Sequence, residues 1–414
     1  MELLDLAAAI VTLTAACAWL NHRFIGLPTT IGVMLIALGV SLALLLAGNT
    51  VLPGAADWAR AALARLDFSR AVLDGMLAFL LFAGALFVDL DALAERRYVI
   101  GALASVGVII STLVAGTLAW LAFAALGLDV GFAWCLVLGA VLAPSDPVAV
   151  LGILKGAGVP ASLETKIVGE SLFNDGVAVV VFLVLVEAAA SGHVDPAGIG
   201  RLFLQEALGG ALFGLALGWI AHHMLRTLDH YQVEILITLA LVMGGYALAH
   251  ALHLSGPIAM VVAGLLLGNH RRQRALSPGS ARHLDHFWEL VDELLNAVLF
   301  VLIGLELLLL PLGLTELLAG LVLIPVVLGA RLAAVGLPVT LLRRFREFSP
   351  GVVRILTWGG LRGGISVALA LSIPAGPARD IVLPATYCVV VFSLVAQGLT
   401  IGRVARALGA DERA

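Results

Sequence analysis

Apolar runs recur along almost the whole chain, separated by short polar connections. A helix of about 20 apolar residues crosses the ~30 Å hydrocarbon core of a bilayer with its backbone hydrogen bonds satisfied internally. Hydrophobic residues make up 61% of the 414 residues and charged residues only 13%, whereas soluble proteins carry about 25% charge. The sequence therefore predicts an all-α polytopic membrane protein. A β-barrel would instead show short segments in which apolar and polar residues alternate.

Hydropathy and helix-breaking residues predict about thirteen transmembrane helices. The predicted spans are 3–20, 28–48, 72–90, 98–126, 131–154, 163–190, 202–225, 232–251, 254–269, 288–310, 315–342, 351–373 and 381–404. Segment 51–70 is predicted to lie on the membrane surface, and 271–287 to be a basic loop leading into an interfacial piece. With the N-terminus outside, 17 of the 24 Lys and Arg residues fall on the cytoplasmic side and 5 outside. The positive-inside rule therefore predicts an external N-terminus and a cytoplasmic C-terminus.

Two predicted spans are interrupted at related positions. Pro144 and Pro147 flank Asp146 in the fifth span, and glycines surround Arg362 in the twelfth. Proline removes an amide donor, and glycine tolerates unwound backbone. Because the two spans are seven apart, the halves that contain them have opposite orientations. Interrupted helices at matching places in two inverted six-helix repeats indicate the midplane site of a transporter.

Three carboxyl groups lie where the bilayer is expected: Asp146, Glu170 and Asp175. A charged side chain at the centre of a membrane helix costs about 2.5–3.5 kcal/mol on insertion scales. Such residues mark an ion or proton pathway by default. We therefore expect the fifth and sixth spans to carry the chemistry of this protein.

Two pairs of polar residues share faces of the sixth span at a spacing of four. Ser171 and Asp175 form one pair, and Glu170 and Asn174 form the other. Asp175 and Ser171 offer hard oxygen ligands for a small alkali cation, to which the interrupted backbone at 143–147 can add carbonyl groups. A carboxylate that holds either a proton or a cation is sufficient for exchange.

Glu170 requires a counter-charge inside the membrane. Two arginines within predicted spans, Arg331 and Arg362, are candidates, and the spacing alone does not choose between them. A buried ion pair with one partner removed is strongly destabilised. Loss of Glu170 or of its arginine should therefore damage folding as well as activity.

Three segments resemble motifs of the monovalent cation/proton antiporter-1 family: Ser145-Asp146-Pro147, 170–176 (Glu-Ser-Leu-Phe-Asn-Asp-Gly) and 358–365 (Trp-Gly-Gly-Leu-Arg-Gly-Gly-Ile). This family contains the NhaP-type sodium/proton antiporters of bacteria and archaea and the animal sodium/proton exchangers. Leu254-Ser255-Gly256, and Phe287-Trp288-Glu289 with Asn296, also resemble family segments, so the likeness covers nearly the whole chain.

The resemblance implies an inverted-repeat antiporter that forms a homodimer. It implies a dimerisation domain from 1–97 and 198–312, a mobile core or transport domain from 98–197 and 313–406, and a cytoplasmic tail at 407–414. The implied ion- and proton-binding residues, which would hold Na⁺, are Asp175, Ser171, Asp146 and Ser145. The implied charge pair and helix-break support consists of Glu170, Arg331, Arg362 and Asn174, with Arg331 as the partner of Glu170.

Two details of the resemblance concern stoichiometry and selectivity. Asn174 stands before Asp175, where electrogenic relatives carry a second aspartate, and this implies electroneutral exchange. Many relatives carry a glutamate in the third span, within a Phe-Glu-Ala-Gly-like segment. Here Phe82-Ala83-Gly84-Ala85 has no carboxylate, so one ligand of the family pattern is missing.

Taken together, these features predict a secondary-active antiporter of the inner membrane that exchanges Na⁺, and also Li⁺, for H⁺. No enzymatic activity, cofactor or nucleic-acid partner is expected. Potassium/proton exchange on the same scaffold is the main alternative. An intramembrane aspartyl protease also needs two aspartates on neighbouring spans, but Asp146 and Asp175 lack its Gly-x-Gly-Asp context. A passive cation channel is the third alternative, against which the inverted helix breaks argue.

Overall fold

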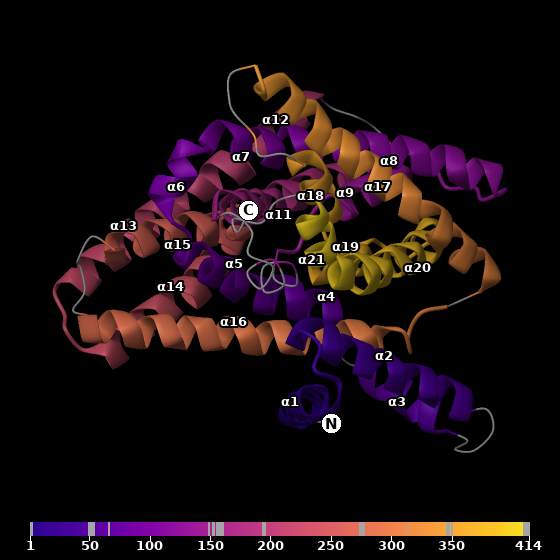
Figure 1. Ribbon diagram of the computed structural model, residues 1–414, viewed down its shortest axis with the longest axis horizontal. Helices are drawn as coiled ribbons and strands as arrows, with labels where there is room; N and C mark the ends of the chain where they lie inside the picture. The colour runs from indigo at the N-terminus through magenta and orange to yellow at the C-terminus, as the bar shows by residue number, and fades with distance from the viewer. Residues whose placement is uncertain are drawn as a thin grey trace.

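The computed structural model describes residues 3–48, 54–64, 67–147, 150, 154, 161–192, 196–272, 278–311, 313–344, 348 and 351–408. All regular secondary structure within these residues is helical (Figure 1). Nine helical stretches among them have the length and apolar composition to cross a membrane, and 132–141 and 256–269 are shorter apolar helices. The predicted all-α polytopic fold is confirmed, while thirteen as the number of crossings stays a prediction.

The helices follow one another closely along the chain. The first half contains α1 (Leu3–Leu20), α2 (Thr29–Gly48), α3 (Ala55–Leu63), α4 (Phe68–Arg70), α5 (Leu77–Leu86), α6 (Leu90–Glu95), α7 (Arg97–Ala104), α8 (Val106–Ala125), α9 (Phe132–Val141) and α11 (Ala161–Ser191). The second half contains α12 (Pro196–Phe203), α13 (Gly210–Arg226), α14 (Tyr231–Ala251), α15 (Gly256–Arg272), α16 (Pro278–Glu306), α17 (Leu314–Leu342), α18 (Val352–Trp358), α19 (Gly364–Ser372), α20 (Pro377–Phe392) and α21 (Gly398–Ala407). Short π-helical segments precede α5, α13 and α21 and follow α1.

One connection differs from its prediction. The segment 271–287, predicted as a basic loop leading into an interfacial piece, is helical at both ends, because α15 continues to Arg272 and α16 begins at Pro278. Residues 273–277 lie outside the described residues. Proline at the first helical position has a backbone angle suited to a helix and lacks only an amide that would be unpaired there. Pro278 therefore starts α16 well before the apolar run that the hydropathy detects.

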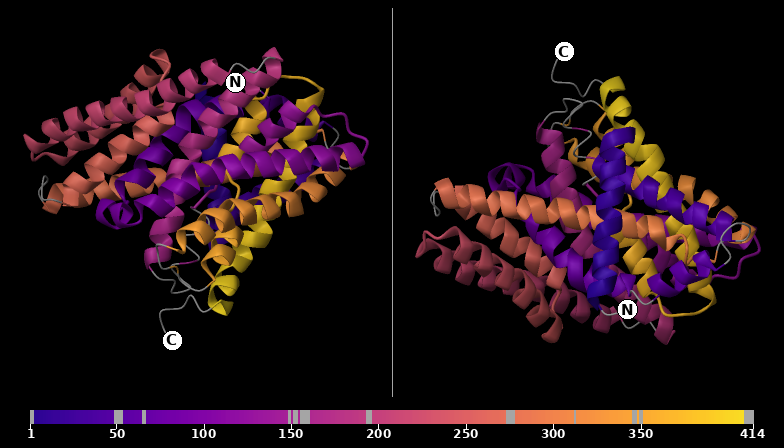
Figure 2. Two further views of the ribbon diagram at one scale, coloured as in Figure 1. Left: turned by 90° about the horizontal axis from the view of Figure 1, so that it is seen from above. Right: turned by 90° about the horizontal axis from the view of Figure 1, so that it is seen from below.

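Two sets of helices pack mainly among themselves. One set contains α1, α2, α5 and α13 to α16, and the other contains α7 to α9, α11 and α17 to α20. Glycines allow the closest approaches in both sets. A Cβ added at Gly214 of α13 would overlap Ala259 of α15, and one added at Gly139 of α9 would overlap Thr112 of α8. Figure 2 shows the start of α1 and the end of α21 on opposite sides of the molecule.

Both predicted helix interruptions lie in the described residues. After α9 ends at Val141 the chain is non-helical through 143–147, and after α18 ends at Trp358 it is non-helical through 360–363. The Asp146 amide donates to the Leu361 carbonyl at 2.8 Å, so the two interruptions meet. The rest of the fifth predicted span lies mostly outside the described residues, since 148–149 and 151–153 are not among them.

Candidate functional site

The two helix interruptions are held together by a buried arginine. Nη1 of Arg362 donates to the carbonyl oxygens of Ala143 at 2.8 Å and Pro144 at 2.7 Å. These carbonyls lie beyond the last turn of α9 and have no partner within a helix. Arg362 is 1% exposed, so the hydrogen bonds form away from bulk water. The arginine that interrupts one helix therefore satisfies the backbone that the other interruption frees.

Ser145 connects the first interruption to α11. Its hydroxyl accepts a hydrogen bond from Asn174 Nδ2 at 2.8 Å and lies 3.0 Å from the Ser171 hydroxyl. Its backbone amide donates to Asn174 Oδ1 at 3.4 Å. All three residues are buried. The structure thus brings together Ser145, Ser171 and Asn174, which the sequence placed on two different spans.

Asp175 lies one turn after Ser171 on α11 and is 6% exposed. Its Oδ1 atom is buried and accepts no hydrogen bond from any described residue. Asp146, Glu170 and Arg362 are the charged groups that act on it electrostatically. Buried polar atoms in folded proteins nearly always have a partner, and an unpaired one is costly. A carboxylate oxygen left in this way suits a bound cation or proton.

Glu170 is paired with Arg331 of α17. Arg331 Nη2 donates to Glu170 Oε2 at 2.9 Å, and Nη1 donates to Oε1. Arg331 Nε also donates to the Leu356 carbonyl of α18 at 3.4 Å. Both members of the pair are buried, and the two-pronged geometry is the strong form of an arginine–carboxylate contact. Of the two arginines that the sequence left open, Arg331 contacts Glu170.

The faces of α11 differ in one respect from the prediction. Glu170 and Asn174 share a helix face by spacing, yet Glu170 contacts Arg331 while Asn174 contacts Ser145, the same residue that Ser171 contacts. The amide side chain of Asn174 extends toward the interruption because the Ser145 amide and hydroxyl need an acceptor and a donor. Spacing along one helix cannot show which neighbouring backbone lacks partners.

Sequence reasoning missed a polar pair that supports the second interruption. The Arg362 amide donates to Ser393 Oγ at 2.9 Å, and Ser393 donates to Gln397 Oε1 at 2.7 Å. Gln397 Nε2 in turn donates to the Trp358 carbonyl at 2.9 Å. Ser393 and Gln397 therefore satisfy an amide and a carbonyl freed where α18 stops. Two polar residues four apart in an otherwise apolar span were the signal that could have found them.

The α5 side of the site is apolar. Ala83 is fully buried, and the nearest atom to a Cβ added at Gly84 would be Leu172 Cδ1, at 3.9 Å. No described group of three or more His, Cys, Asp or Glu residues has the geometry of a metal cluster. The oxygen atoms available near Asp175 are those of single carboxylates, serine hydroxyls and unwound backbone. Such a set fits a weakly held, exchangeable cation better than a resident metal.

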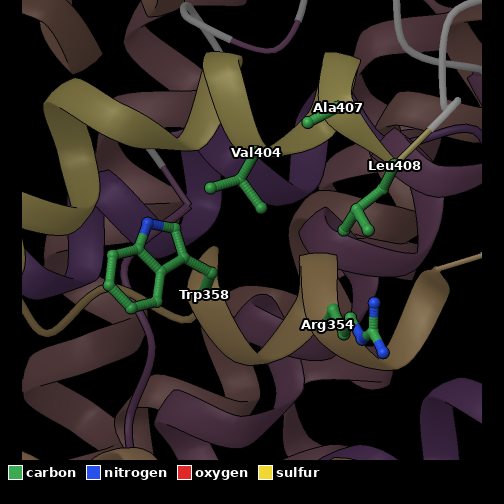
Figure 3. Close-up of a pocket in the computed structure, with 5 residues that line it drawn as sticks. All are labelled: Arg354, Trp358, Val404, Ala407 and Leu408. Atoms are coloured by element: carbon green, nitrogen blue, oxygen red, sulfur yellow. The ribbon is translucent and has the colours of Figure 1, made fainter.

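A groove lies between the end of the chain's last described helix, α21, and α18, the helix that ends at the second interruption. Figure 3 shows Val404, Ala407 and Leu408 facing Trp358 and Arg354 of α18. Trp358 Nε1 donates to Thr400 Oγ1 of α21 at 2.9 Å. None of the residues that line the groove belongs to the Asp175 cluster. The groove therefore belongs to the packing of α21 against α18 and is separate from the proposed ion site.

The comparisons with known proteins agree with this geometry. A family model described as "Sodium/hydrogen exchanger, transmembrane" matches residues 10–407. The chain belongs to this family. It is 50% identical to the Na⁺/H⁺ antiporter NhaP of Pseudomonas aeruginosa over 99% of this chain and 98% of that protein. It is 34% identical to the Na⁺/H⁺ antiporter NhaH of Halobacillus dabanensis over 99% of this chain and 98% of that protein.

The fold is that of a solved relative. The sodium proton antiporter MjNhaP1 of Methanocaldococcus jannaschii superposes with a TM-score of 0.76 at 19% identity, covering 99% of each chain. The resemblance to the cation/proton antiporter family noted in the sequence is therefore confirmed, and the chain is a member of a transporter family rather than an enzyme. The intramembrane protease alternative is not supported by any of these findings.

Proposed function

We propose that this protein is a Na⁺/H⁺ antiporter in which one Na⁺ and one H⁺ compete for Asp175. The observation that carries this proposal is the buried Oδ1 of Asp175, which accepts no hydrogen bond from a described residue. The two helix interruptions beside it are connected by hydrogen bonds of Asp146 and Arg362. Two relatives that match nearly the whole chain are named Na⁺/H⁺ antiporters, which supports the same ion pair. Na⁺ is the substrate here, with Asp175, Ser171, Ser145 and Asp146 as the residues that would hold it.

The charge of the cluster supports one-for-one exchange. Glu170, Asp175 and Asp146 carry three negative charges when ionised, and Arg331 and Arg362 carry two positive charges. Among these five groups one negative charge remains, and either one Na⁺ or one proton would neutralise it. Binding both together would leave a buried positive charge, which is unfavourable in a low-dielectric site. The cluster would therefore have the same net charge with either ion bound, which makes exchange electroneutral.

The wider arrangement follows from the same proposal. The helix set that contains Asp175 would move against the set that contains α16, exposing the site alternately to each side of an inner membrane. The proposed topology has the N-terminus outside and the C-terminus in the cytoplasm, as the distribution of Lys and Arg favours. The helix set with α1, α2, α5 and α13 to α16 would supply the contact of a homodimer, leaving the other set free to move. Lipids would be the only other partners, with no cofactor.

The test is ion exchange by the purified protein in proteoliposomes. An imposed pH gradient should drive Na⁺ and Li⁺ exchange by the parent protein, and Asp175→Asn should reduce this exchange to the background of protein-free vesicles. Asp91→Asn, the same chemical change at an exposed position, is the matched control and should exchange normally. Normal transport by Asp175→Asn would overturn the proposed role of this carboxylate.

The same vesicles separate the remaining alternatives. Exchange of K⁺ in preference to Na⁺ would replace the proposed substrate with potassium, an outcome that the apolar Ala83 position makes worth measuring. Cation flux without an opposing proton flux would indicate a channel. A membrane potential is worth about 2.3 kcal/mol per charge per 100 mV. A potential imposed at fixed ion gradients should leave the initial rate unchanged, and a voltage-dependent rate would contradict one-for-one exchange.

A further inference from the structure

Helix α16 presents one continuous face to the helices that hold the ion site. Asp292, Asn296, Leu299, Ile303 and Glu306 recur at spacings of three and four, which places them within about 80° of arc on a helix of 3.6 residues per turn. The far side of α16 packs elsewhere, since a Cβ at Gly304 would overlap Met34 and Ala37 of α2. Figure 1 shows α16 as a single long helix across the molecule.

The middle of this face touches the second helix interruption. A Cβ added at Gly364, two residues after Arg362, would overlap the Leu299 side chain. The Ile303 carbonyl accepts a hydrogen bond from Tyr387 of α20 at 2.9 Å. Leu299 and Ile303 are both buried. The face is therefore apolar at the level of the site, where it excludes water.

Each end of the face carries a carboxylate. Asp292 and Glu306 each lie seven residues from Leu299, which puts them about 10 Å away along the axis in opposite directions. The separation of the two carboxylates, about 21 Å, covers most of the ~30 Å hydrocarbon core. An acidic group thus lies at a similar distance along α16 on each side of Leu299, which contacts the second interruption.

Asp292 lies within electrostatic range of the first helix interruption. It is half-buried, accepts a hydrogen bond from Asn296 Nδ2 at 3.1 Å, and interacts electrostatically with Asp146 of the first interruption. Asn296 is itself buried and also donates to the Asp292 carbonyl at 2.9 Å, which fixes its side chain. Two carboxylates that repel each other in this way together attract a passing cation.

Glu306 occupies the corresponding place at the other end. It is 5% exposed, and no described residue forms a hydrogen bond or ion pair with its carboxylate. Arg379 and Tyr387 of α20 interact with it electrostatically, which places Glu306 against the helix set that contains Asp175. A carboxylate buried this deeply without a close partner is costly unless it has a functional role.

We propose that Asp292 and Glu306 are the cation-gathering residues of the two alternating approaches to the ion site, one for each side of the membrane. The proposal rests on the proposed antiport and adds to it the residues that determine apparent cation affinity on each side. Leu299 and Ile303 separate the two approaches. The site would communicate with Asp292 when open to one side and with Glu306 when open to the other.

The experiment measures sided kinetics in proteoliposomes whose protein orientation is fixed by a one-sided blocking reagent. Na⁺ is varied on one side at a time for the parent protein, Asp292→Asn and Glu306→Gln. Each variant should raise the apparent KM for Na⁺ on a single side by roughly three- to tenfold, the range expected for removing one nearby unit charge in a partly solvated path. The two variants should affect opposite sides, Asp292→Asn the cytoplasmic one under the proposed topology.

Matched controls are available beside each residue. Glu293→Gln removes an exposed carboxylate next to Asp292, and Asp380→Asn removes an exposed carboxylate next to Arg379. Both should leave KM on the two sides within twofold of the parent. If a neutral variant fails to fold, Asp292→Glu and Glu306→Asp keep the charge and displace it, and should give the same sidedness with a smaller shift.

The outcomes separate this proposal from the antiport on which it rests. A parent protein that exchanges no alkali cation would overturn the proposed function. A parent that exchanges Na⁺ normally, with variants that change KM equally on both sides or lower only the maximal rate, would overturn the assignment of Asp292 and Glu306 while leaving the antiport intact.

Discussion

The site contains two buried arginines, and their positive charges are compensated in different ways. Arg331 is neutralised by the full charge of Glu170, with both Nη atoms on one carboxylate. Arg362 is 1% exposed and uses Nη1 to donate to two backbone carbonyls instead. Its Nε and Nη2 atoms donate no hydrogen bond to any described residue. One arginine is fixed by a side-chain charge, and the other by the dipoles of an interrupted helix.

The contrast between Arg331 and Arg362 distinguishes a structural part of the site from a part whose charge can change. The charges of Glu170 and Arg331 compensate each other, and this compensation does not depend on the transported ion. Arg362 remains only partly compensated, and Asp175 and Glu170 are the acidic groups that act on it. Since Asp175 is the group proposed to change its occupant, the environment of Arg362 would change in each transport cycle, whereas that of Arg331 would not.

The largest effect is expected from breaking the Glu170–Arg331 ion pair. Glu170→Gln or Arg331→Ala leaves an unpaired buried charge, which destabilises a protein by about 3–5 kcal/mol. We expect thermal unfolding of the detergent-solubilised protein at a much lower temperature, with little protein recovered from membranes. Glu187→Gln, at an exposed position on the same helix, is the control and should unfold like the parent. Partial recovery of stability in the double variant Glu170→Gln/Arg331→Met would attribute the loss to the unpaired charge.

The next effect concerns Arg362. Arg362→Ala removes the donor from two buried carbonyls, for which the combined penalty is about 2–4 kcal/mol. Lysine keeps one charged donor, so Arg362→Lys should recover part of this loss. Arg331→Lys should recover less, because lysine cannot reproduce a two-pronged contact with a carboxylate. Unfolding temperatures of these three variants and of Arg331→Ala test the expectation, and a lysine better tolerated at 331 than at 362 would contradict it.

Much of this architecture could be predicted from the sequence because it depends on local signals. Apolar runs identify membrane helices, and Pro144, Pro147 and the glycines around Arg362 identify the interruptions. The partner of Glu170 could not be chosen by such signals, since Arg331 lies 161 residues away and both Arg331 and Arg362 stand within predicted membrane spans. The family resemblance, and not such a signal, implied Arg331, which the structure places against Glu170.

Polar contacts to backbone were the least predictable part of the site. Ser393 and Gln397 contact an amide and a carbonyl that become unpaired only because α18 stops at Trp358. Asn174 contacts Ser145 for a similar reason. The need for these contacts arises where helices are interrupted, and no periodicity in α11 or in the π-helical segment 393–397 indicates their direction. The start of α16 at Pro278 was missed because hydropathy detects apolar residues and not helix caps.

An intermediate effect is expected from substituting two glycines, one beside Arg331 and the other beside Asp146. A Cβ at Gly360 would overlap Arg331 at Nε, and one at Gly363 would overlap the Asp146 carboxylate. Gly360→Ala pushes on a rigid buried pair and should cost about 1–3 kcal/mol of stability, the usual range for overpacking. Gly363→Ala displaces a half-buried side chain and should raise the apparent KM for Na⁺ with a smaller change in unfolding temperature. Equal loss of stability in both would argue that Asp146 is held as rigidly as Arg331.

The smallest effect is expected at Ser393, which supports Arg362 from the other side. Ser393→Ala removes the acceptor of the Arg362 amide and the donor to Gln397, and a buried hydrogen bond of this kind contributes about 1 kcal/mol. Ser366→Ala is a matched control on α19, since Ser366 is fully buried and its Oγ has no partner among the described residues. It should be neutral or slightly stabilising. If both variants lower the unfolding temperature equally, the loss comes from the missing volume of the hydroxyl, and the backbone around Arg362 does not depend on Ser393.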